Sequence, residues 1–471
     1  MSIFTILENR KKILGMNERQ LVYVRRYNKS RAIQIADDKI LTKKILNASE
    51  IPNPKLLAVI GNYMQLEEFD FSLLPASFVV KPVKGLEGGG VEIFYNRDEN
   101  GNWIRANKSR VSPEQLIQHI KDILDGRYSL AQQPDQAMFE ERVKIHKAFR
   151  YYVYKGTPDV RIIVFNHIPT MSYIRLPTKE SEGKANLVKG ALGLGIDMAT
   201  GITTSGIHGK SGNIDYIPGT KLSVSGLKIP YWNKILEYAI KVQQATNLNF
   251  AAIDFLIDRD LGPMIVELNA RPGLSIQLAN KDGLRWRLRK TRGIKVKTVE
   301  KGIRLAKDMF GGEIEEEIEN ISGKEVIGIY ENVKLYSKDM QEIEAKAKID
   351  TGADSTSIDK QLALNLGFKE ILDAMESKNI PDNLPREESL KLMKDLSQEL
   401  LPKYPDLIDV IYVESSHGSS LRPYVKISLK IKDTQFETSA TIFDRSHLVY
   451  PIIVGRKSLT KFLVDPSKTR T

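Results

Sequence analysis

Two short apolar runs around a turn signal constrain the fold of this chain more than any other stretch. Residues 250–274 read FAAIDFLIDRDLGPMIVELNARPGL, and acidic or amide residues interrupt the apolar runs at 251–257 and 264–270. The sequence DRDLGP, residues 258–263, separates the runs and is typical of a turn. The pattern therefore predicts a β-hairpin.

Two carboxylates and an amide converge on one face of this predicted hairpin. If the turn is centred near residues 260 and 261, Asp254 lies opposite Glu267, and Asn269 shares the face of Glu267 because strand side chains alternate. Like charges directly opposite each other repel, whereas hard oxygen ligands suit Mg²⁺. The sequence therefore predicts a magnesium site, with a hairpin that carries solvated acidic side chains as the alternative.

The chain is long enough for several domains. Its 471 residues predict roughly two to four of them, and 41% hydrophobic with 27% charged residues is typical of a globular protein. No apolar run approaches the ~20 residues of a membrane span, and the charged start does not resemble a signal peptide. We therefore expect a cytoplasmic protein. The absence of cysteine excludes disulfides and thiolate metal sites.

Positive charge is in excess, and part of it lies in runs. The net charge of +11 favours anionic partners such as nucleotides, acidic peptides or nucleic acid, although scattered lysines are also typical of a solvated surface. Residues 1–36 are predicted to be helical and basic, with Arg25 and Arg26 adjacent. The basic run at 285–292 is compatible with steering of nucleic acid or an acidic substrate, or with a solvated helix face.

A helix is predicted over residues 37–46, DDKILTKKIL, whose apolar residues recur at helical spacing. It should end before the prolines of residues 51–54. The functional interpretation places Lys39 or Lys43 on a nucleotide phosphate, and an ordinary amphipathic helix is the alternative.

Residues 78–94, FVVKPVKGLEGGGVEIF, predict a strand, a glycine-rich turn and a second strand. Glycines can bring successive backbone N–H groups close to an anion, and two flanking lysines add positive charge. Neither the Walker A pattern nor the dinucleotide fingerprint is present. Plain β-turn geometry is the alternative explanation. The glycines are Gly85, Gly88, Gly89 and Gly90, and the lysines are Lys81 and Lys84.

Further segments complete the first region. Residues 112–125 and 231–246 are predicted to be helices, and residues 151–154 and 160–165 to be strands. Residues 172–201 are predicted to be rich in loops.

A change of pattern divides the chain. Residues 311–324, GGEIEEEIENISGK, combine glycines with acidic residues and are interpreted as a linker. Beyond them, period-2 alternation at 342–349, 425–431 and 436–442 predicts an antiparallel β-rich domain. Residues 370–405 are rich in Glu, Lys and Leu and predict a helical insertion.

The motifs of residues 30–310, in their order, resemble the ATP-grasp superfamily and within it the RimK-type alpha-L-glutamate ligases. DDKILTKKIL resembles the helix that opens the nucleotide fold, FVVKPVKGLEGGGV the phosphate-covering hairpin, and MFEERV the adenine hinge. RLPT and KANL resemble the loop that completes the phosphate and acceptor site, and AAIDFLI with MIVELNARPGL resembles the metal hairpin. The resemblance implies ATP contacts from Lys39, Lys43, Lys81, Gly88, Gly89, Gly90, Glu140, Glu141, Val143, Lys184 and Asn186, binding of Mg²⁺ (or Mn²⁺) by Asp254, Glu267 and Asn269, and catalytic roles for Arg175 and Arg271.

The chemistry that this resemblance implies is carboxylate activation, in which ATP forms an acyl phosphate that an amine attacks to give an amide. Phosphoryl transfer of this kind depends on positioning and charge neutralisation, so no protein nucleophile is required. The chain departs from RimK-type ligases at its start. Fewer than 40 residues precede the DDK motif, where those ligases carry a whole α/β subdomain that helps to form the substrate cleft. The acceptor is therefore left open.

Residues 325–471 resemble the retropepsin-like aspartic proteases, and among them the RimB-like proteins called putative ATP-dependent zinc proteases. KIDTGADSTS, which contains Asp350, matches the active-site turn, and PIIVGR at 451–456 resembles the second mark of that family. A retropepsin domain supplies one catalytic aspartate, so the resemblance implies a homodimer with Asp350 from each chain, and Gly418 is a flap candidate. Zinc finds no support, because His417 and His447 lie in no metal-ligand spacing and cysteine is absent.

The sequence as a whole predicts an α+β ATP-grasp domain followed by a β-rich retropepsin-like domain with a helical insertion. We expect a helical segment at 1–36, a ligase domain at 37–310, a linker at 311–324 and the second domain at 325–471. The expected function is a bifunctional enzyme that acts on an amino acid or peptide, with no membrane partner and no nucleic acid. The alternatives are a protease gated by ATP and a peptide-binding scaffold with an inactive retropepsin domain.

Overall fold

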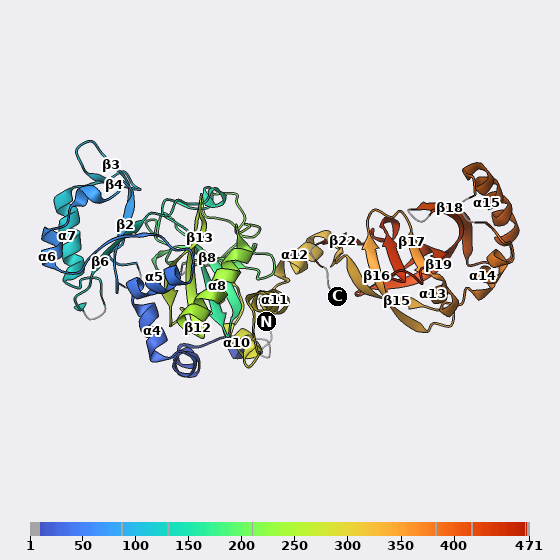
Figure 1. Cartoon of the computed structure of the whole chain (residues 1–471), viewed down its shortest axis with the longest axis horizontal. Helices are drawn as coiled ribbons and strands as arrows, with labels where there is room; N and C mark the ends of the chain where they lie inside the picture. The colour runs from blue at the N-terminus through green and yellow to red at the C-terminus, as the bar shows by residue number, and fades with distance from the viewer. Residues whose placement is uncertain are drawn as a thin grey trace. The chain divides into compact units, whose positions relative to one another are not determined.

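The computed structural model describes residues 10–85, 88–129, 132–209, 211–381, 384–415, 418–466 and 468. The chain divides into two compact units, Met1–Ile314 and Glu315–Thr471 (Figure 1). No helix of the described residues is long and apolar enough to cross a bilayer.

The first unit begins with a series of helices. Asp38 caps the helix predicted at 37–46, because its carboxylate accepts hydrogen bonds from the backbone N–H groups of Ile40 and Leu41, both at 2.9 Å. That helix ends before Pro52, as predicted. The helices of this part are α2 (Met16–Glu18), the π-helix η1 (Arg19–Val24), α3 (Arg25–Tyr27), α4 (Ser30–Asp37) and α5 (Lys39–Ala48).

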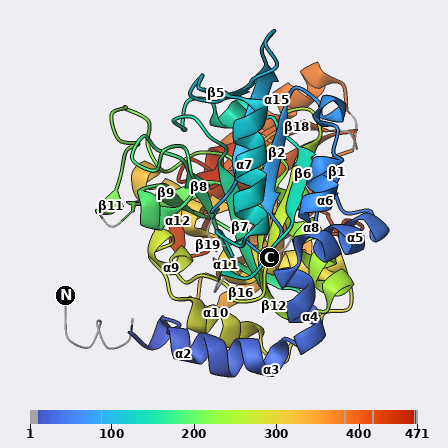
Figure 2. The ribbon, with the colours of Figure 1, turned by 90° about the vertical axis from the view of Figure 1, so that its left-hand side faces the viewer.

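A six-stranded sheet follows, in the order β1-β6-β2-β3-β4-β5. Helix α7 (Pro113–Leu124) crosses this sheet (Figure 2) and buries Leu116, Ile120 and Ile123 against it. Ser112 and Gln115 form a capping box at its start, so the helix predicted at 112–125 is confirmed. The other elements are β1 (Leu56–Ile60), α6 (Tyr63–Glu67), β2 (Phe78–Pro82), β3 (Glu92–Arg97), β4 (Trp103–Arg105), β5 (Arg110–Val111) and β6 (Ala137–Glu141).

The second sheet of this unit has seven antiparallel strands in the order β11-β10-β9-β8-β7-β12-β13. Helices cover both of its faces. The strands are β7 (Asp159–Phe165), β8 (Ile168–Leu176), β9 (Leu192–Ile196), β10 (Thr203–His208), β11 (Gly212–Ile214), β12 (Phe250–Asp258) and β13 (Gly262–Asn269). The helices are α8 (Trp232–Thr246), α9 (Ile276–Ala279), α10 (Leu284–Thr291) and α11 (Val299–Phe310).

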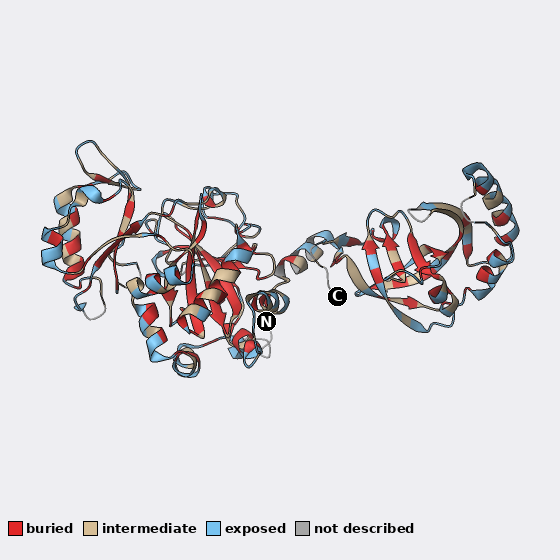
Figure 3. Ribbon diagram, viewed as in Figure 1, coloured by how far each residue is buried: buried red, intermediate tan, exposed pale blue. Residues whose placement is uncertain are grey.

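Both faces of this sheet are buried, which explains its nearly continuous apolar strands (Figure 3). On β7, Val160, Ile162 and Val164 pack in the core that α8 and α11 cover. Ile163 and Phe165, on the other face, pack with residues of the N-terminal helices, α9 and α10.

Two predictions for this region are wrong. Residues 151–154 are turns and bends and not a strand, because the chain there runs as a loop between β6 and β7. The loop-rich prediction for 172–201 missed the end of β8 and the whole of β9, whose alternate glycines obscure the strand pattern.

The second unit is built on a sheet in the order β15-β16-β21-β17-β20-β19-β18. Because β15 also pairs with β19, the strands from β15 to β19 in that order close into a ring around one apolar core. The strands are β15 (Tyr330–Tyr336), β16 (Glu342–Asp350), β17 (Thr356–Asp359), β18 (Leu407–Ser415), β19 (Gly418–Ile431), β20 (Thr434–Phe443) and β21 (Ile452–Gly455).

Two helices of the second unit, α14 (Lys369–Glu376) and α15 (Arg386–Leu400), lie where the sequence predicts an insertion at 370–405. A further helix, α13 (Lys360–Asn365), precedes this segment and was not predicted. Two short strands, β14 (Glu325–Ile327) and β22 (Phe462–Val464), pair in parallel and bring the two ends of the unit together. Helix α12 (Glu313–Ser322) occupies most of the segment that the sequence presents as a linker.

Candidate functional site

The main cavity of the first unit lies between its two sheets and has a volume of about 1100 Å³. This is slightly above the upper end, about 1,000 Å³, of ordinary ligand pockets, so a nucleotide and a second substrate both fit. Three of the residues that the sequence assigned to this unit's site, Lys43, Gly90 and Asp254, do not line it. Those that do are Lys39, Lys81, Gly88, Gly89, Glu140, Glu141, Val143, Arg175, Lys184, Asn186, Glu267, Asn269 and Arg271.

The hairpin of β12 and β13 contains the predicted cross-strand pair, although the pairing next to the turn is centred on residue 260 and not between residues 260 and 261. Asp254 pairs with Glu267 across the two strands, and the register shifts directly after Asp254. The carboxylate of Asp254, however, is occupied. It accepts hydrogen bonds from Arg161 at 2.6 Å on each oxygen and from Arg175 at 2.8 Å. These two guanidinium groups supply the positive charge that the sequence argument assigned to a metal ion.

A second carboxylate, that of Asp159, joins the cluster of Asp254, Arg161 and Arg175. Asp159 lies opposite Arg175 on the neighbouring strand and accepts two hydrogen bonds from it. Burial raises the pKa of Asp159 to about 6, with Asp254 adding to the effect and Arg175 opposing it. Burial acts in the same direction on Asp254, but there Arg161 and Arg175 outweigh it and hold the pKa below its ordinary value.

Glu267 and Asn269 fit a magnesium ion better than Asp254 does in this arrangement. Both line the cavity, and the buried side-chain nitrogen of Asn269 has no hydrogen-bond partner among the described residues. No group of three His, Cys, Asp or Glu side chains in the described part of the chain is placed to hold a metal. One carboxylate and an amide suit Mg²⁺, which takes its remaining ligands from phosphates and water. The role of Asp254 as a metal ligand stays a prediction.

A buried ion-pair cluster supports the opposite wall. Glu140 lies between Lys81 at 2.5 Å and Lys43 at 3.0 Å, and only 4% of its surface is exposed. Burial alone would raise the pKa of Glu140, but the two ammonium groups hold it below the ordinary value. Glu140 and Lys43 therefore fix Lys81, which faces the cavity. Lys39 donates hydrogen bonds to the carbonyl groups of Val83 at 3.0 Å and of the glycine loop at 3.2 Å.

The glycine-rich loop is held at both ends. Before it, the backbone N–H of Lys84 donates to the carboxylate of Asp135 at 2.8 and 3.1 Å. After it, His119 on α7 lies 3.0 Å from the carbonyl oxygen of Gly90. Gly90 has φ +69°, and a Cβ there would lie 2.6 Å from the ring of Tyr128, so only glycine fits. Residues 86 and 87 lie outside the described residues.

Lys184, Asn186 and Arg271, which the resemblance assigns to the nucleotide or the reacting group, also line the cavity. The side chain of Asn186 accepts a hydrogen bond from the N–H of Val188 at 2.9 Å and so caps a short 3₁₀ turn, which is a structural role. Arg271 forms an ion pair with Asp37 at 2.8 Å.

Sequence reasoning missed several partners at this site. The sequence pattern at 160–165 predicts a strand but assigns no role to Asp159 or Arg161. Their spacing of two residues within an apolar strand was a usable signal, because it places both side chains on one face. The anchors Asp135 and His119 are remote in sequence from the residues they hold, and no local pattern marks them.

In the second unit, Asp350 ends β16 and is partly exposed. Its carboxylate accepts hydrogen bonds from Gly352 N–H at 3.1 Å and Ala353 N–H at 3.3 Å, and from the ammonium group of Lys348 at 3.2 Å. Burial raises its pKa, but the Lys348 contact and the two N–H groups outweigh this and lower it. Gly418, the flap candidate, is the first residue of β19. Residues 416 and 417, the second of which is His417, lie outside the described residues.

The two sequence motifs of this unit, the turn that contains Asp350 and the segment 451–456, lie next to each other. Strands β16 and β21 pair in parallel, and Asp350 lies across from Gly455. A Cβ at Gly455 would lie 2.4 Å from the backbone of Ser355, so a side chain there would collide with the turn that carries Asp350. Asp354 of the same turn forms ion pairs with Arg456 at 2.6 Å and with the next lysine at 2.7 Å.

Comparison with solved structures gives low similarity. The ATP-grasp ligase PsnB in complex with a minimal precursor is 13% identical, with 56% of this chain and 60% of that chain covered and a TM-score of 0.29. D-alanine–D-alanine ligase from Bacillus anthracis in complex with ATP is 15% identical, with 59% and 67% covered and a TM-score of 0.29. A protein of unknown function from Legionella pneumophila is 19% identical, with 31% and 96% covered and a TM-score of 0.17. These similarities carry no argument about activity.

The comparison with family models assigns the first unit to a family and leaves the second unit without an assignment. No curated protein matches the chain. The model of the sugar-transfer associated ATP-grasp family matches residues 18–293, which is more than half of the chain and includes both walls of the cavity. The second unit lies outside the match and has no family assignment. The chain belongs to the sugar-transfer associated ATP-grasp family.

Proposed function

We propose that the first unit joins a carboxylate to an amine at the expense of ATP, through an acyl phosphate. The observation that carries the proposal is the composition of the cavity walls. Lys39, Lys81 and the glycine loop line one side, and Glu267, Asn269 and Arg271 line the other. This arrangement offers cations to the phosphates and oxygen ligands to Mg²⁺ within one space.

The residues divide the work by their contacts. Lys81, fixed by Glu140, meets the phosphates, and the loop that His119 anchors covers them. Mg²⁺ (or Mn²⁺), held by Glu267 and Asn269, would neutralise charge on the transferring phosphoryl group. Arg175 lines the same space and is held by buried carboxylates, so its charge is fixed in position before substrate enters. The second substrate is an amino acid or a peptide, with glutamate ligation as the finer proposal from the RimK resemblance.

The test combines the protein, Mg-ATP and pairs of candidate carboxylates and amines, glutamate included, and follows ADP release and product mass. Lys81→Met should reduce turnover by about a hundredfold, since one preorganised cation at the transferred group is lost. Lys44→Met, an exposed lysine on α5, is the matched control and should leave turnover unchanged. Absence of ADP release with every pair, or full activity of Lys81→Met, would contradict the ligase proposal.

We propose for the second unit a retropepsin-like aspartic peptidase that works as a homodimer. The observation in its favour is the pairing of Asp350 with Gly455, which joins the two sequence marks of that family in one site. One unit supplies one such aspartate, and two are needed to share a proton and activate water.

Peptide cleavage by the wild type and by Asp350→Asn, with and without ATP, separates the alternatives. Loss of cleavage in the variant supports the peptidase, and cleavage only with ATP, without any new amide bond, supports a gated protease. Retained peptide binding without turnover in either protein supports a scaffold. A strictly monomeric species in sedimentation would contradict the dimeric peptidase.

A further inference from the structure

The positive charge of the chain is concentrated in two segments of the first unit. Residues 10–31 contain eight Lys and Arg residues and one acid, Glu18, and residues 284–297 contain seven Lys and Arg residues and no acid. The whole chain has a net charge of only +11, so the remaining residues are net negative. Such separation is more than the scatter of lysines on a solvated surface.

The structure brings the two segments together. Arg285 on α10 forms an ion pair with Glu18 on α2, Arg289 lies 3.6 Å from the same carboxylate, and Arg285 also donates to the carbonyl oxygen of Lys11. Figure 2 shows α2, α3 and α10 side by side. The single acid of these segments is therefore already paired with arginine. We define the basic face by its exposed cations, which are Arg10, Lys11, Lys12, Arg25, Arg26, Arg289, Lys290 and Arg292.

Aliphatic side chains are exposed among these cations. Met16 is 67% exposed, Leu21 60% and Ile13 50%, and Val22 is about one third exposed, at 36%. The opposite side of the same helical run is fixed to the core through Tyr23, whose ring contacts Phe165 and Phe250. The helical run therefore exposes a surface that contains both aliphatic and cationic side chains. Because Tyr23 is packed in the core, the helix cannot rotate about its axis to bury that surface.

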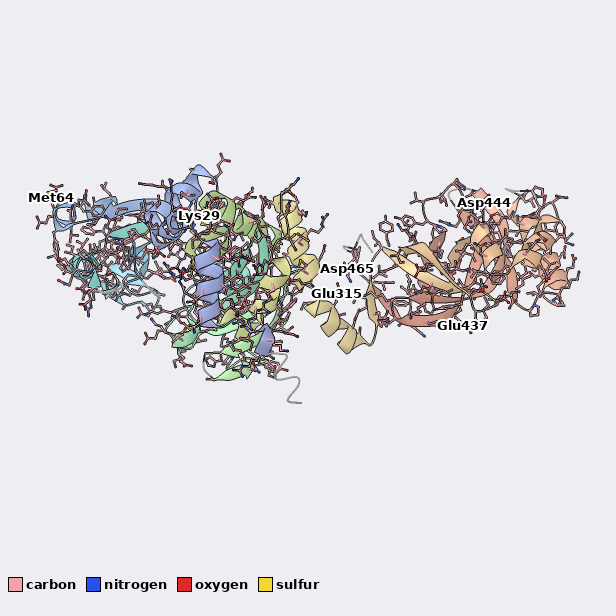
Figure 4. All side chains as sticks on the ribbon, turned by 90° about the horizontal axis from the view of Figure 1, so that it is seen from below. Lys29, Met64, Glu315, Glu437, Asp444 and Asp465 are labelled. Carbon is pink, nitrogen blue, oxygen red and sulfur yellow. The ribbon has the colours of Figure 1, made fainter. Side chains whose placement is uncertain are left out.

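Helical spacing places the two kinds of side chain next to each other. Leu21 precedes Arg25 by four residues and Val22 precedes Arg26 by four, which is about one turn of the continuous run from α2 to α3. Lys29, labelled in Figure 4, is exposed directly after this run and adds one more cation. Cations flanked by exposed aliphatic residues on one helical side are the pattern of a helix that lies in the head-group region of a bilayer.

We propose that the basic face docks the protein on a bilayer surface that contains acidic phospholipids. The cations bind the lipid phosphates, and the aliphatic side chains enter the boundary between head groups and acyl chains. A nucleic acid fits the charge equally well but not the aliphatic residues, since single strands are bound by stacking on aromatic rings. The proposal replaces the expectation, drawn from the sequence, that the protein has no membrane partner.

Flotation of the full chain with vesicles tests this docking. We expect binding to vesicles of phosphatidylcholine with phosphatidylglycerol, none to pure phosphatidylcholine, and weaker binding at high salt. The double variant Arg25→Glu with Arg26→Glu should weaken binding by at least about tenfold. Met16→Asn with Leu21→Asn leaves every charge in place and should also weaken it. Lys391→Glu with Lys394→Glu, on exposed positions of α15, makes the same change of charge elsewhere and should have no effect.

Three results would overturn the proposal. They are absence of binding to acidic vesicles by the wild type, equal loss in the α15 control, and full binding by the Met16 and Leu21 double variant. A single-stranded oligonucleotide that binds while acidic vesicles do not would assign the face to nucleic acid instead. Circular dichroism and thermal melting of each variant establish that the fold is intact.

Discussion

The substitution Asp254→Asn separates two views of the hairpin by the sign of its effect on stability. If Asp254 were an unpaired carboxylate opposite Glu267, its neutralisation would relieve repulsion and raise the free energy of unfolding in the absence of metal. The structure instead gives Asp254 three hydrogen bonds from Arg161 and Arg175, with 1% of its surface exposed. The substitution then leaves buried guanidinium groups without a full counter-charge. Breaking a buried pair in this way costs about 3–5 kcal/mol.

Urea denaturation with a chelator present measures this difference directly. We expect Asp254→Asn to lower the free energy of unfolding by about 3 kcal/mol or more, with an unchanged dependence on urea. Glu267→Gln is the matched control, because the side chain of Glu267 lines the cavity and makes no hydrogen bond or ion pair with another described residue. Its change should stay within about 0.5 kcal/mol. A neutral or stabilising Asp254→Asn would refute the inference that Arg161 and Arg175 stabilise this carboxylate in the metal-free protein.

Three further predictions concern single side chains. The pKa of Asp159 is raised to about 6 in the folded protein, so the folded state retains a proton that the unfolded chain loses near pH 4. The free energy of unfolding should therefore decrease by on the order of 3 kcal/mol as the pH rises from about 4 to about 6. Denaturation at each pH should show a smaller decrease for Asp159→Asn. Gly90→Ala should cost about 2 kcal/mol or more of thermal stability, whereas Gly88→Ala, with a similar φ of +70° but open space around it, should cost only about 1 kcal/mol. Lys348→Met removes the contact that lowers the pKa of Asp350, so carboxyl NMR should show that aspartate titrating at a higher pH, and an unchanged titration would contradict the pairing.

Local patterns in the sequence were sufficient for two elements that carry the site, the hairpin of β12 and β13 and helix α5. The turn residues at 258–263 determine the hairpin, and Asp254 lies opposite Glu267 as predicted. This pair also depends on the register shift after Asp254, because Asp258 pairs with Gly262 next to the turn. Asp38 and the prolines at 52 and 54 limit helix α5 in the same local way. In each case the residues that define the element are also its neighbours in the chain.

Side-chain partners could not be predicted in this way. The hairpin pattern predicts a metal at Asp254 and cannot reveal Arg161 and Arg175, which come from two strands more than 75 residues away along the chain. The family motif names a carboxylate and does not specify what neutralises it. The closed ring of strands in the second unit depends on the pairing of β15 with β19, which joins residues about 95 positions apart and has no local signature.

The pairing of β14 with β22 has a consequence for how the second unit is attached. Its first and last strands are neighbours, so the chain enters and leaves this unit at one place. A domain with this property can be added to another protein through a single connection, without opening its own sheet and without threading through its partner. The second unit can therefore be gained, lost or exchanged as a whole, without opening its own sheet.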